Sequence, residues 1–462
     1  MTYHELQKKF PTFHYRDYSW QVDENNDFVV DFAFVAGEHE FFPRVRIKNI
    51  VGLEAWVTQA ANKPIIDTLV FNLGLIELFS YWKAFCSPKI IIEKGTLSQK
   101  QAVFWKKLLL QGMGQYFYEN NIVDFSKKNF VDFSFSKAKS VPTKHFKTRD
   151  YLFGLGGGKD SAVGIEVFKK ASENFSVLML NPIPSSLEMA KISGAQDQVI
   201  IERKICPKLL ELNQQGFLNG HTPFSAYLAF LGTLCAILGG YKGFVVANEN
   251  SANEESLIWQ EKKINHQYSK SLAFEKDFRR YLSENISRDL EYFSIIRPLN
   301  EIKCAQIFSS LTQYHKIFLS CNVAQRSYSG TKKPTFSWCG NCSKCLFAYL
   351  ILYPFLGKEK AIEIFGSDLF ENSALIGDLE ALSGYTQGKP LECVGMRLET
   401  LAALKFGLEY NRQNALPDQV LLKRAREILA KKKISKTQLK ALFKLQKNFL
   451  PKKLLAGLKT LL

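Results

Sequence analysis

The pattern of hydrophobic and polar positions changes character near residue 150. Before that point, residues 18–36 place strand-like apolar side chains on both sides of a polar turn at 24–27, which predicts a β-hairpin. Residues 64–86 and 98–120 carry apolar side chains at helical spacing. Residues 124–149 are polar, lysine-rich and irregular, so we expect an N-terminal α+β domain at 1–148.

From Tyr151 onward, short apolar runs alternate with helical segments. Thr222 and Pro223 offer an N-cap and a first-turn proline for an apolar helix that ends near Leu238. This alternation predicts a parallel, doubly wound sheet, in which ligands bind beyond the carboxyl ends of the strands. The predicted strands lie at residues 151–155, 176–180, 198–201 and 243–247.

The C-terminal part reads as helical. We expect the doubly wound domain to cover 149–357, a helical region with glycine breaks to cover 358–419, and a basic tail to cover 420–462. The tail has 13 Lys and Arg against one acid, Glu427, so it carries +12 of the formal net charge of +17. Its leucines among lysines predict amphipathic helices with a solvated basic face and an apolar stripe packed on the protein. A contact with membrane or nucleic acid is the competing interpretation.

Composition narrows the class of protein. The chain has 462 residues, too many for one compact core, with 46% hydrophobic and 23% charged residues, as in soluble globular proteins. We find no apolar run of the ~18 to 20 residues that cross a bilayer, and no secretory signal in the first residues. We therefore expect a cytoplasmic protein without a transmembrane segment. In such a reducing compartment, clustered cysteines indicate a metal site.

The glycine-rich run at residues 154–161 lies between a predicted strand and a predicted helix. Backbone N–H groups of Gly156, Gly157 and Gly158 can converge on phosphate oxygens, and the helix N-terminus adds positive charge. Lys159 can bring a cation to the phosphates, Asp160 can hold Mg²⁺, and Ser161 can donate to a phosphate or cap the helix. A plain strand-to-helix turn is the alternative interpretation.

The order of residues after the glycines selects the kind of phosphate loop. A Walker A loop requires Ser or Thr after the lysine, whereas Asp160 follows Lys159 here. The run Gly157 to Ser161 instead resembles the PP-loop of ATP pyrophosphatases, with Gly156 in place of the leading serine. That resemblance implies cleavage of ATP to AMP and pyrophosphate, usually by adenylation of a substrate.

A second cluster consists of Cys339, Cys342 and Cys345, with two residues between neighbours. Zinc prefers four ligands, and Cys321 is the best fourth candidate, which would make a closed structural site. An iron–sulfur cluster is the competing metal, and three free thiols the non-metal alternative. The cysteine pattern beside a PP-loop resembles 7-cyano-7-deazaguanine synthase over residues 150–350, which supports the fold and Cys321 as a ligand.

A longer resemblance covers about residues 15–410. Its segments are similar to MurL, the family of UDP-N-acetylmuramoyl-L-alanyl-L-glutamate epimerases. The segments are residues 71–74, 80–83, 156–161, 215–225, 248–254, 265–271, 338–345 and 389–395.

The MurL resemblance implies a reaction and its cofactors. The family converts the terminal L-glutamate of a peptidoglycan precursor to D-glutamate with ATP and Mg²⁺, and releases AMP and pyrophosphate. A carboxylate's charge makes the adjacent Cα proton hard to remove, and adenylation makes that proton more acidic. A base and an acid then exchange the proton between faces. The implied partner is a small-molecule substrate, a UDP-N-acetylmuramoyl dipeptide.

The residues that transfer the proton are not fixed by the sequence. His221 precedes a predicted helix, where the dipole keeps imidazole neutral, and His266 lies in a polar segment with Lys270. Glu249 follows a predicted strand and could act as a base or bind a second Mg²⁺. Lys270 and Arg297 could pair with the substrate's diphosphate or carboxylates, or form surface ion pairs.

Two other classes of function remain open at this stage. One is a PP-loop ligase or a nucleobase- or tRNA-modifying enzyme. The other is a nucleic-acid-binding protein that would bind through the zinc site and the basic tail. The concentration of positive charge in the tail disfavours this second class.

Overall fold

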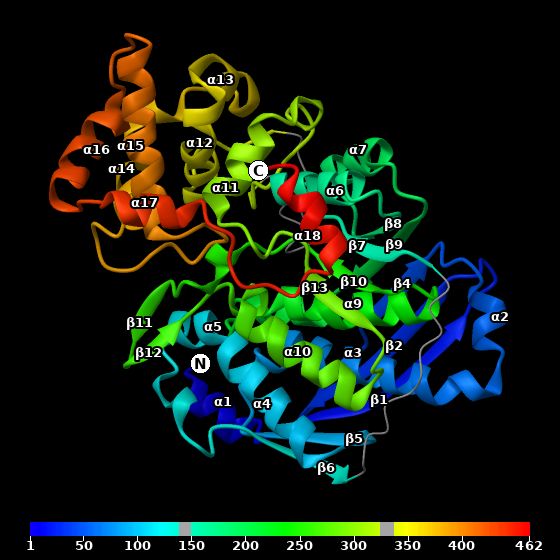
Figure 1. The fold of residues 1–462 in the computed structure, drawn as a ribbon. Coiled ribbons are helices and arrows are strands. Elements are labelled where there is room, and N and C mark those ends of the chain that lie inside the picture. Colours follow the sequence, from blue (N-terminus) through cyan, green and yellow to red (C-terminus); the bar gives the residue numbers. More distant parts are fainter. Residues whose placement is uncertain (138–148, 324–336) are drawn as a thin grey trace.

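A computed structural model describes residues 1–137, 149–323 and 337–462 (Figure 1). Its centre is an 11-stranded sheet in the order β13-β10-β7-β8-β9-β4-β2-β1-β5-β6, with β3 added to β2, and β11 and β12 form a separate hairpin. The strands are β1 (Thr12–Val22), β2 (Phe28–Ala36), β3 (His39–Phe41), β4 (Arg44–Lys48), β5 (Lys89–Leu97), β6 (Asp132–Lys137), β7 (Tyr151–Gly154), β8 (Phe175–Leu180), β9 (Gln198–Lys204), β10 (Gly243–Val246), β11 (Leu257–Trp259), β12 (Lys262–Ile264) and β13 (Glu291–Ser294).

Helices cover both faces of this sheet and form the C-terminal region. Those up to the end of the sheet are α1 (Tyr3–Lys9), α2 (Leu53–Val57), α3 (Lys63–Trp82), α4 (Gln99–Gly112), α5 (Gly114–Glu119), α6 (Lys159–Lys170), α7 (Pro184–Ser193), α8 (Pro207–Gln214), α9 (Phe224–Leu238) and α10 (Leu272–Asn285). Those that follow are α11 (Glu301–Ser309), α12 (Ser343–Leu356), α13 (Lys358–Phe365), α14 (Ile376–Leu382), α15 (Arg397–Gln413), α16 (Val420–Lys431), α17 (Lys436–Leu442) and α18 (Lys452–Lys459).

The predicted parallel sheet is confirmed in the strands β7 to β10, and β13 extends it. The chain runs outward from β7 through β8 to β9, then crosses to β10 on the other side of β7 and continues to β13. The strand order therefore reverses between β7 and β10. In doubly wound sheets a ligand crevice opens at the carboxyl ends of the strands at this switch point.

Alternation along these strands explains why both faces of the sheet are covered. Successive side chains of a strand point to opposite faces. Leu152, Leu178 and Phe244 enter the core that contains α3, α9 and α10. Their neighbours Phe153, Val177 and Val245 enter the core that contains α6, α11 and α12. These strands are almost entirely apolar because both of their faces are buried.

The N-terminal strands continue the same sheet. The predicted hairpin is confirmed as β1 and β2, which pair antiparallel around a turn at 23–27. Strand β4 pairs antiparallel with β9, so blue and teal segments far apart in sequence lie side by side (Figure 1). The strands before and after the expected domain division at 148/149 therefore belong to one sheet. Residue 148 itself lies outside the described residues. That division stays a prediction.

The basic tail packs on the protein, as the favoured interpretation of its pattern predicts. Leu421, Leu454 and Leu458 are buried in the same core as α6 and α11. Lys453 bonds Glu173 at 2.6 Å, and α18 lies against α6 (Figure 1). The tail therefore covers the outer face of the helix that follows the glycine loop.

Three features differ from the sequence-based expectations. Pro223 is the N-cap of α9 and not its first helical residue, because its ψ of 71° is not helical and the N–H of Phe224 bonds the carbonyl of Thr222 at 2.7 Å. The helix expected over 98–120 breaks at Met113 into α4 and α5. Among the described residues, the stretch Ala60–Trp82 is long and apolar enough to cross a membrane, and 78% of its most apolar window is buried inside the protein.

A buried ion pair joins strand β9 to helix α3. Arg203 of β9 donates to both carboxylate oxygens of Glu77 in α3, at 2.8 and 2.9 Å. The Glu77 side chain is completely buried. The Arg203 guanidinium also lies 4.6 Å from the ring centroid of Tyr227 in α9.

We predict that Arg203→Met lowers the free energy of unfolding by about 3 to 5 kcal/mol, because Glu77 would remain buried without its partner. Lys48→Met is the matched control: Lys48 bonds Glu202 between β4 and β9, but both side chains are partly exposed, so its loss should cost under about 1 kcal/mol. Urea denaturation followed by circular dichroism measures both. Equal, small losses in the two variants would contradict the assigned role of the pair.

Candidate active site

The glycine loop connects β7 to α6 at the switch point of the sheet. Gly157 has a φ of +80°, and a Cβ there would lie 2.6 Å from Ser185 Oγ and 2.7 Å from the Ser186 nitrogen, so only glycine fits. The N–H of Gly156 donates to Ser161 Oγ at 3.2 Å. The loop therefore packs closely on the start of α7, and Ser161 holds it from the first turn of α6.

Three carboxylates converge beside this loop. Asp160 lies in the first turn of α6, Glu249 lies three residues after the end of β10, and Glu301 begins α11. Oxygens of all three lie within 4.8 Å of one another. Lys159 lies among them, with its Nζ 2.5 Å from Asp160 Oδ1 and 2.7 Å from Glu301 Oε1.

Burial gives this cluster unusual electrostatics. It raises the pKa of Glu301 well above its ordinary value, an effect that Lys159 opposes and that Asp160 and Glu249 increase. Burial and Asp160 likewise raise the pKa of Glu249. Burial disfavours the charge on Lys159, but Asp160 and Glu301 outweigh it and raise the pKa of Lys159. Oε2 of Glu301 is buried and has no partner among the described residues.

The charge and spacing of the cluster fit a divalent cation. Three carboxylates and one ammonium give a formal charge of −2, which one Mg²⁺ would neutralise. An octahedral ion with Mg–O distances of about 2.1 Å places its ligand oxygens about 2.9 to 4.2 Å apart. The separations here are compatible with that geometry after small shifts.

Arg297 proves to be a buried structural residue. Its Nε donates to Glu275 at 2.8 Å, and its other nitrogens donate to the carbonyl oxygens of Glu249 at 2.6 Å and Lys270 at 2.5 Å. Both partners of the Arg297–Glu275 pair are buried. Arg297 therefore fixes the backbone at Glu249 and Lys270 and is not free to bind a substrate.

The two predicted histidines and Lys270 meet in a second cluster. The rings of His221 and His266 lie 4.4 Å apart, and His266 Nδ1 lies 2.5 Å from Gln115 Oε1. Cys393, from the C-terminal region, joins them: its Sγ lies 3.2 Å from Lys270 Nζ and 3.5 Å from His266 Nε2.

Burial and nearby cations keep both imidazoles neutral. Burial, then Lys270, lowers the pKa of His266 to about 3. Burial, then His266 and Lys83, lowers the pKa of His221 well below its ordinary value. The Nε2 atom of His221 is buried without a partner in the described part of the chain. Because Cys393 and Glu249 outweigh burial, the pKa of Lys270 is raised and its ammonium stays charged.

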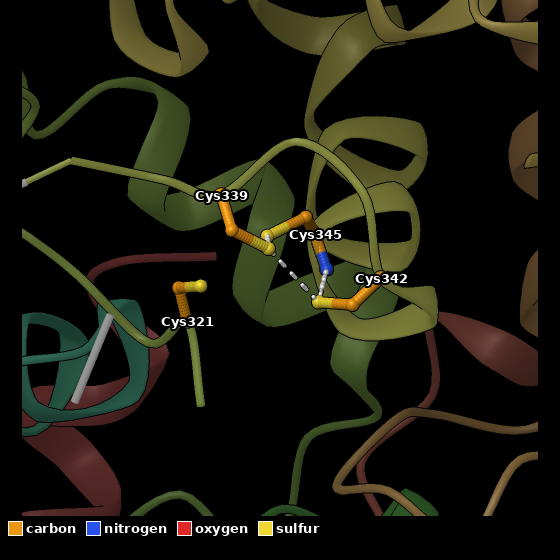
Figure 2. A group of neighbouring side chains, drawn as sticks. All are labelled: Cys321, Cys339, Cys342 and Cys345. Carbon is orange, nitrogen blue, oxygen red and sulfur yellow. Dashed lines mark hydrogen bonds between the residues drawn. The ribbon is translucent and has the colours of Figure 1, made fainter. Parts of the chain in front are cut away.

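The four cysteines converge in a third cluster (Figure 2). Cys339 Sγ lies 3.5 Å from the sulfurs of Cys342 and Cys345, and all four sulfurs lie within 4.8 Å of one another. A tetrahedral zinc with Zn–S bonds of about 2.3 Å places its sulfurs about 3.8 Å apart. The residue types and separations therefore fit zinc.

Asn322 joins the cysteine cluster to the second cluster. It follows Cys321, and its side chain donates to the carboxylate of Glu392, the residue before Cys393. Its Oδ1 accepts a bond from Lys344, which lies between Cys342 and Cys345, at 3.0 Å. A metal bound by the four cysteines would hold Asn322 in place, and through Asn322 the loop that carries Cys393.

The structure brings together most of the residues predicted from the sequence and adds others. Residues 156–161 lie with Glu249, and His221, His266 and Lys270 lie together. Glu301, Gln115 and Cys393 were missed as site residues. Cys393 could have been found because it lies in residues 389–395, which carry part of the MurL resemblance. The only sequence signal for Glu301 is its position at the start of a helix that follows a short strand.

Two protein-family models together match most of the chain. Residues 4–295 match the MurL N-terminal domain and residues 317–440 match the MurL C-terminal domain. The first of these matches extends across the division that we expected at 148/149. No solved structure matches the chain.

Curated relatives carry one common name, UDP-N-acetyl-alpha-D-muramoyl-L-alanyl-L-glutamate epimerase. The protein from Xanthomonas oryzae pv. oryzae is 33% identical over 74% of this chain and 75% of its own length. The protein from Micromonospora sp. is 29% identical over 77% of this chain and 79% of its own. That from Salinispora tropica is 30% identical over 74% and 75%. With both domain matches and these relatives, the chain belongs to the MurL family.

Proposed function

We propose that this protein epimerises the terminal L-glutamate of UDP-N-acetylmuramoyl-L-alanyl-L-glutamate, using ATP to activate the glutamate carboxyl group. The names of the relatives support the substrate and the outcome. The observation that carries the use of ATP is the meeting of Asp160, Glu249 and Glu301 beside the glycine loop. Phosphates, a divalent cation and the start of a helix belong together at such a switch point.

The glycine loop and α6 would bind the phosphates of ATP. Gly157 and Gly158 would offer backbone N–H groups to the phosphates, and the N-terminus of α6 would add positive potential. Lys159 stays charged in this position and can stabilise the departing pyrophosphate. These features support a PP-loop type of domain for residues around β7 to β10.

Asp160, Glu249 and Glu301 would hold Mg²⁺. When bound, the ion would neutralise the triphosphate and favour departure of pyrophosphate. Its charge would also keep the three carboxyl groups ionised, although burial alone raises the pKa of Glu249 and Glu301. Oε2 of Glu301, which has no hydrogen-bond partner in the described structure, would be one ligand atom of this ion.

The second cluster would carry out the proton transfer. Attack of the glutamate carboxylate on the α-phosphorus of ATP gives a mixed anhydride and pyrophosphate. The anhydride no longer carries the carboxylate charge, so the Cα proton becomes more acidic. Arg297 bonds the carbonyl oxygens of Glu249 and Lys270, so it links the phosphate cluster to the second cluster. An activated glutamate held beside Glu249 would therefore lie near Lys270 and the two histidines. Hydrolysis of the anhydride by water then releases AMP.

The four cysteines would bind a structural zinc ion. Four thiolates leave no open coordination position, so the site would have no direct part in the chemistry. Its contribution would be to hold Asn322 and Lys344, and through Asn322 the loop that carries Cys393.

We predict that Asp160→Asn and Glu301→Gln each reduce AMP formation by about 100-fold or more. Each change would remove a carboxylate ligand of Mg²⁺, so the ion would stabilise the phosphates less. The protein is incubated with the UDP-muramoyl dipeptide, ATP and Mg²⁺ in D₂O, and AMP and deuterium at the glutamate Cα are measured. Glu202→Gln, a partly exposed carboxylate paired with Lys48, is the matched control and should react like the wild type. Wild-type protein that exchanges the Cα proton without ATP would contradict the proposal.

We predict one zinc ion per chain, detected by elemental analysis in a colourless protein. Cys342→Ser should lose the metal and unfold at a lower temperature, because a structural zinc site contributes directly to folding. Cys206→Ser, at a cysteine far from the cluster in sequence and outside it, should keep both metal and stability. Visible absorbance with bound iron would instead indicate an iron–sulfur cluster, and full zinc in Cys342→Ser would rule out the four-cysteine site.

A further inference from the structure

The thiol of Cys393 contacts both a cationic and an imidazole side chain. Its Sγ contacts an ammonium group, Lys270 Nζ at 3.2 Å, and an imidazole, His266 Nε2 at 3.5 Å. The side chain is only partly buried. By contrast, Cys86, Cys235 and Cys304 are buried, and Cys321, Cys339, Cys342 and Cys345 lie with one another.

The loop that carries Cys393 is held firmly against the residues around Lys270. Gln267 donates to the carbonyl oxygen of Val394 at 2.9 Å. Lys389 donates to the carbonyl oxygen of Gly395 at 3.0 Å and to Glu254 at 3.1 Å. Such bonds on both sides of one residue keep its side chain in a defined position, as an acid or base in a reaction requires.

We propose that Cys393 is the base that removes the Cα proton from the activated L-glutamate. This inference rests on the proposed function, because the proton is acidic enough only after the carboxyl group has been activated. Cys393 comes from the C-terminal region, whereas Asp160 lies on α6 after β7 and Glu249 lies in the segment after β10. The proposal therefore gives the C-terminal region a part in the chemistry.

The charges around the sulfur favour its thiolate form. Burial raises the pKa of Cys393, and so does Asp160, but Lys270 and Lys344 outweigh them and bring the pKa below its ordinary value. The bond from Lys270 to the sulfur acts in the same direction. These charges therefore stabilise the thiolate relative to the thiol, compared with an ordinary cysteine.

The neighbouring groups are weaker bases. Lys270 keeps its proton because its pKa is raised, so it has no lone pair to offer. His266 has a lone pair, but a pKa of about 3 makes its conjugate acid too strong for the imidazole to remove a carbon-bound proton efficiently. Within this cluster, Cys393 alone combines a basic atom with a stabilising cation.

The proton transfer balances without a further reagent. The Cα–H bond breaks, its electron pair moves into the activated carboxyl group to form an enolate, and the proton ends on Sγ. A proton then reaches the opposite face of Cα from a second acid. His221 is the candidate: it gives the N–H proton of its neutral ring and regains one from water, and the hydroxide so formed takes the proton from Sγ–H, which restores the thiolate.

The test compares Cys393→Ser with wild type and with Cys206→Ser as the matched control. Each protein is incubated with the UDP-muramoyl dipeptide, ATP and Mg²⁺ in D₂O. We expect Cys393→Ser to form AMP within a few-fold of the wild-type rate, and to lose deuterium incorporation and epimerisation by about 100- to 10,000-fold, the usual contribution of a general base. Cys206→Ser should match the wild type in all three measurements.

A second measurement follows the thiol itself. The rate of alkylation of Cys393 by iodoacetamide is measured against pH by mass spectrometry. Because the thiolate form is lost as the pH falls through its pKa, we expect a midpoint below about 8.5 in the wild type. Lys270→Gln should move that midpoint to higher pH, since the stabilising cation is gone.

The outcomes separate this inference from the function on which it rests. Deuterium incorporation by Cys393→Ser at the wild-type rate would overturn the role of Cys393 and leave the proposed function intact. Equal loss of AMP formation and deuterium incorporation in Cys393→Ser would show a structural role and also overturn it. Wild-type protein that forms AMP without exchange at Cα would overturn both.

Discussion

Four charged side chains at the switch point of the sheet, three of them buried, are the constraint on which the site depends. Lys159, Asp160, Glu249 and Glu301 together carry a formal charge of −2 in a largely buried position. Removing ions from water costs several kcal/mol each, so their arrangement requires compensation. The N-termini of α6 and α11 supply part of it, and a divalent cation would supply the remainder. In the proposed function, the glycine loop would hold the phosphates of a nucleotide beside that cation.

The rest of the structure connects this centre to the second cluster. Arg297 is buried against Glu275 and bonds the backbone of both Glu249 and Lys270, so one side chain sets the separation of the two clusters. The C-terminal region contributes Cys393, and Asn322 links its loop to the four cysteines. An enzyme that first activates a carboxyl group and then moves the adjacent proton needs such a fixed relation between two centres.

The parts that were predictable from the sequence are those that local patterns determine. The strand, glycine run and helix at 151–170 follow from neighbouring residues, and the spacing of Cys339, Cys342 and Cys345 itself predicts that they converge. Glu301 and Cys393 could not be found in this way, because each joins its cluster through packing between segments distant in the chain. The antiparallel pairing of β4 with β9 is equally non-local. Arg297 looked free for a substrate because its buried partner Glu275 is separated from it by a strand.

Transfer of oxygen from the substrate to AMP would show whether the glutamate carboxyl group itself attacks ATP. The dipeptide substrate is prepared with ¹⁸O in the α-carboxyl group of its glutamate, and the AMP formed during epimerisation is analysed by mass spectrometry. If the carboxylate attacks the α-phosphorus and water later attacks the carbonyl carbon, each AMP carries one ¹⁸O atom from the substrate. Epimerised product accompanied by AMP without ¹⁸O would show that the glutamate carboxyl group does not attack the α-phosphorus.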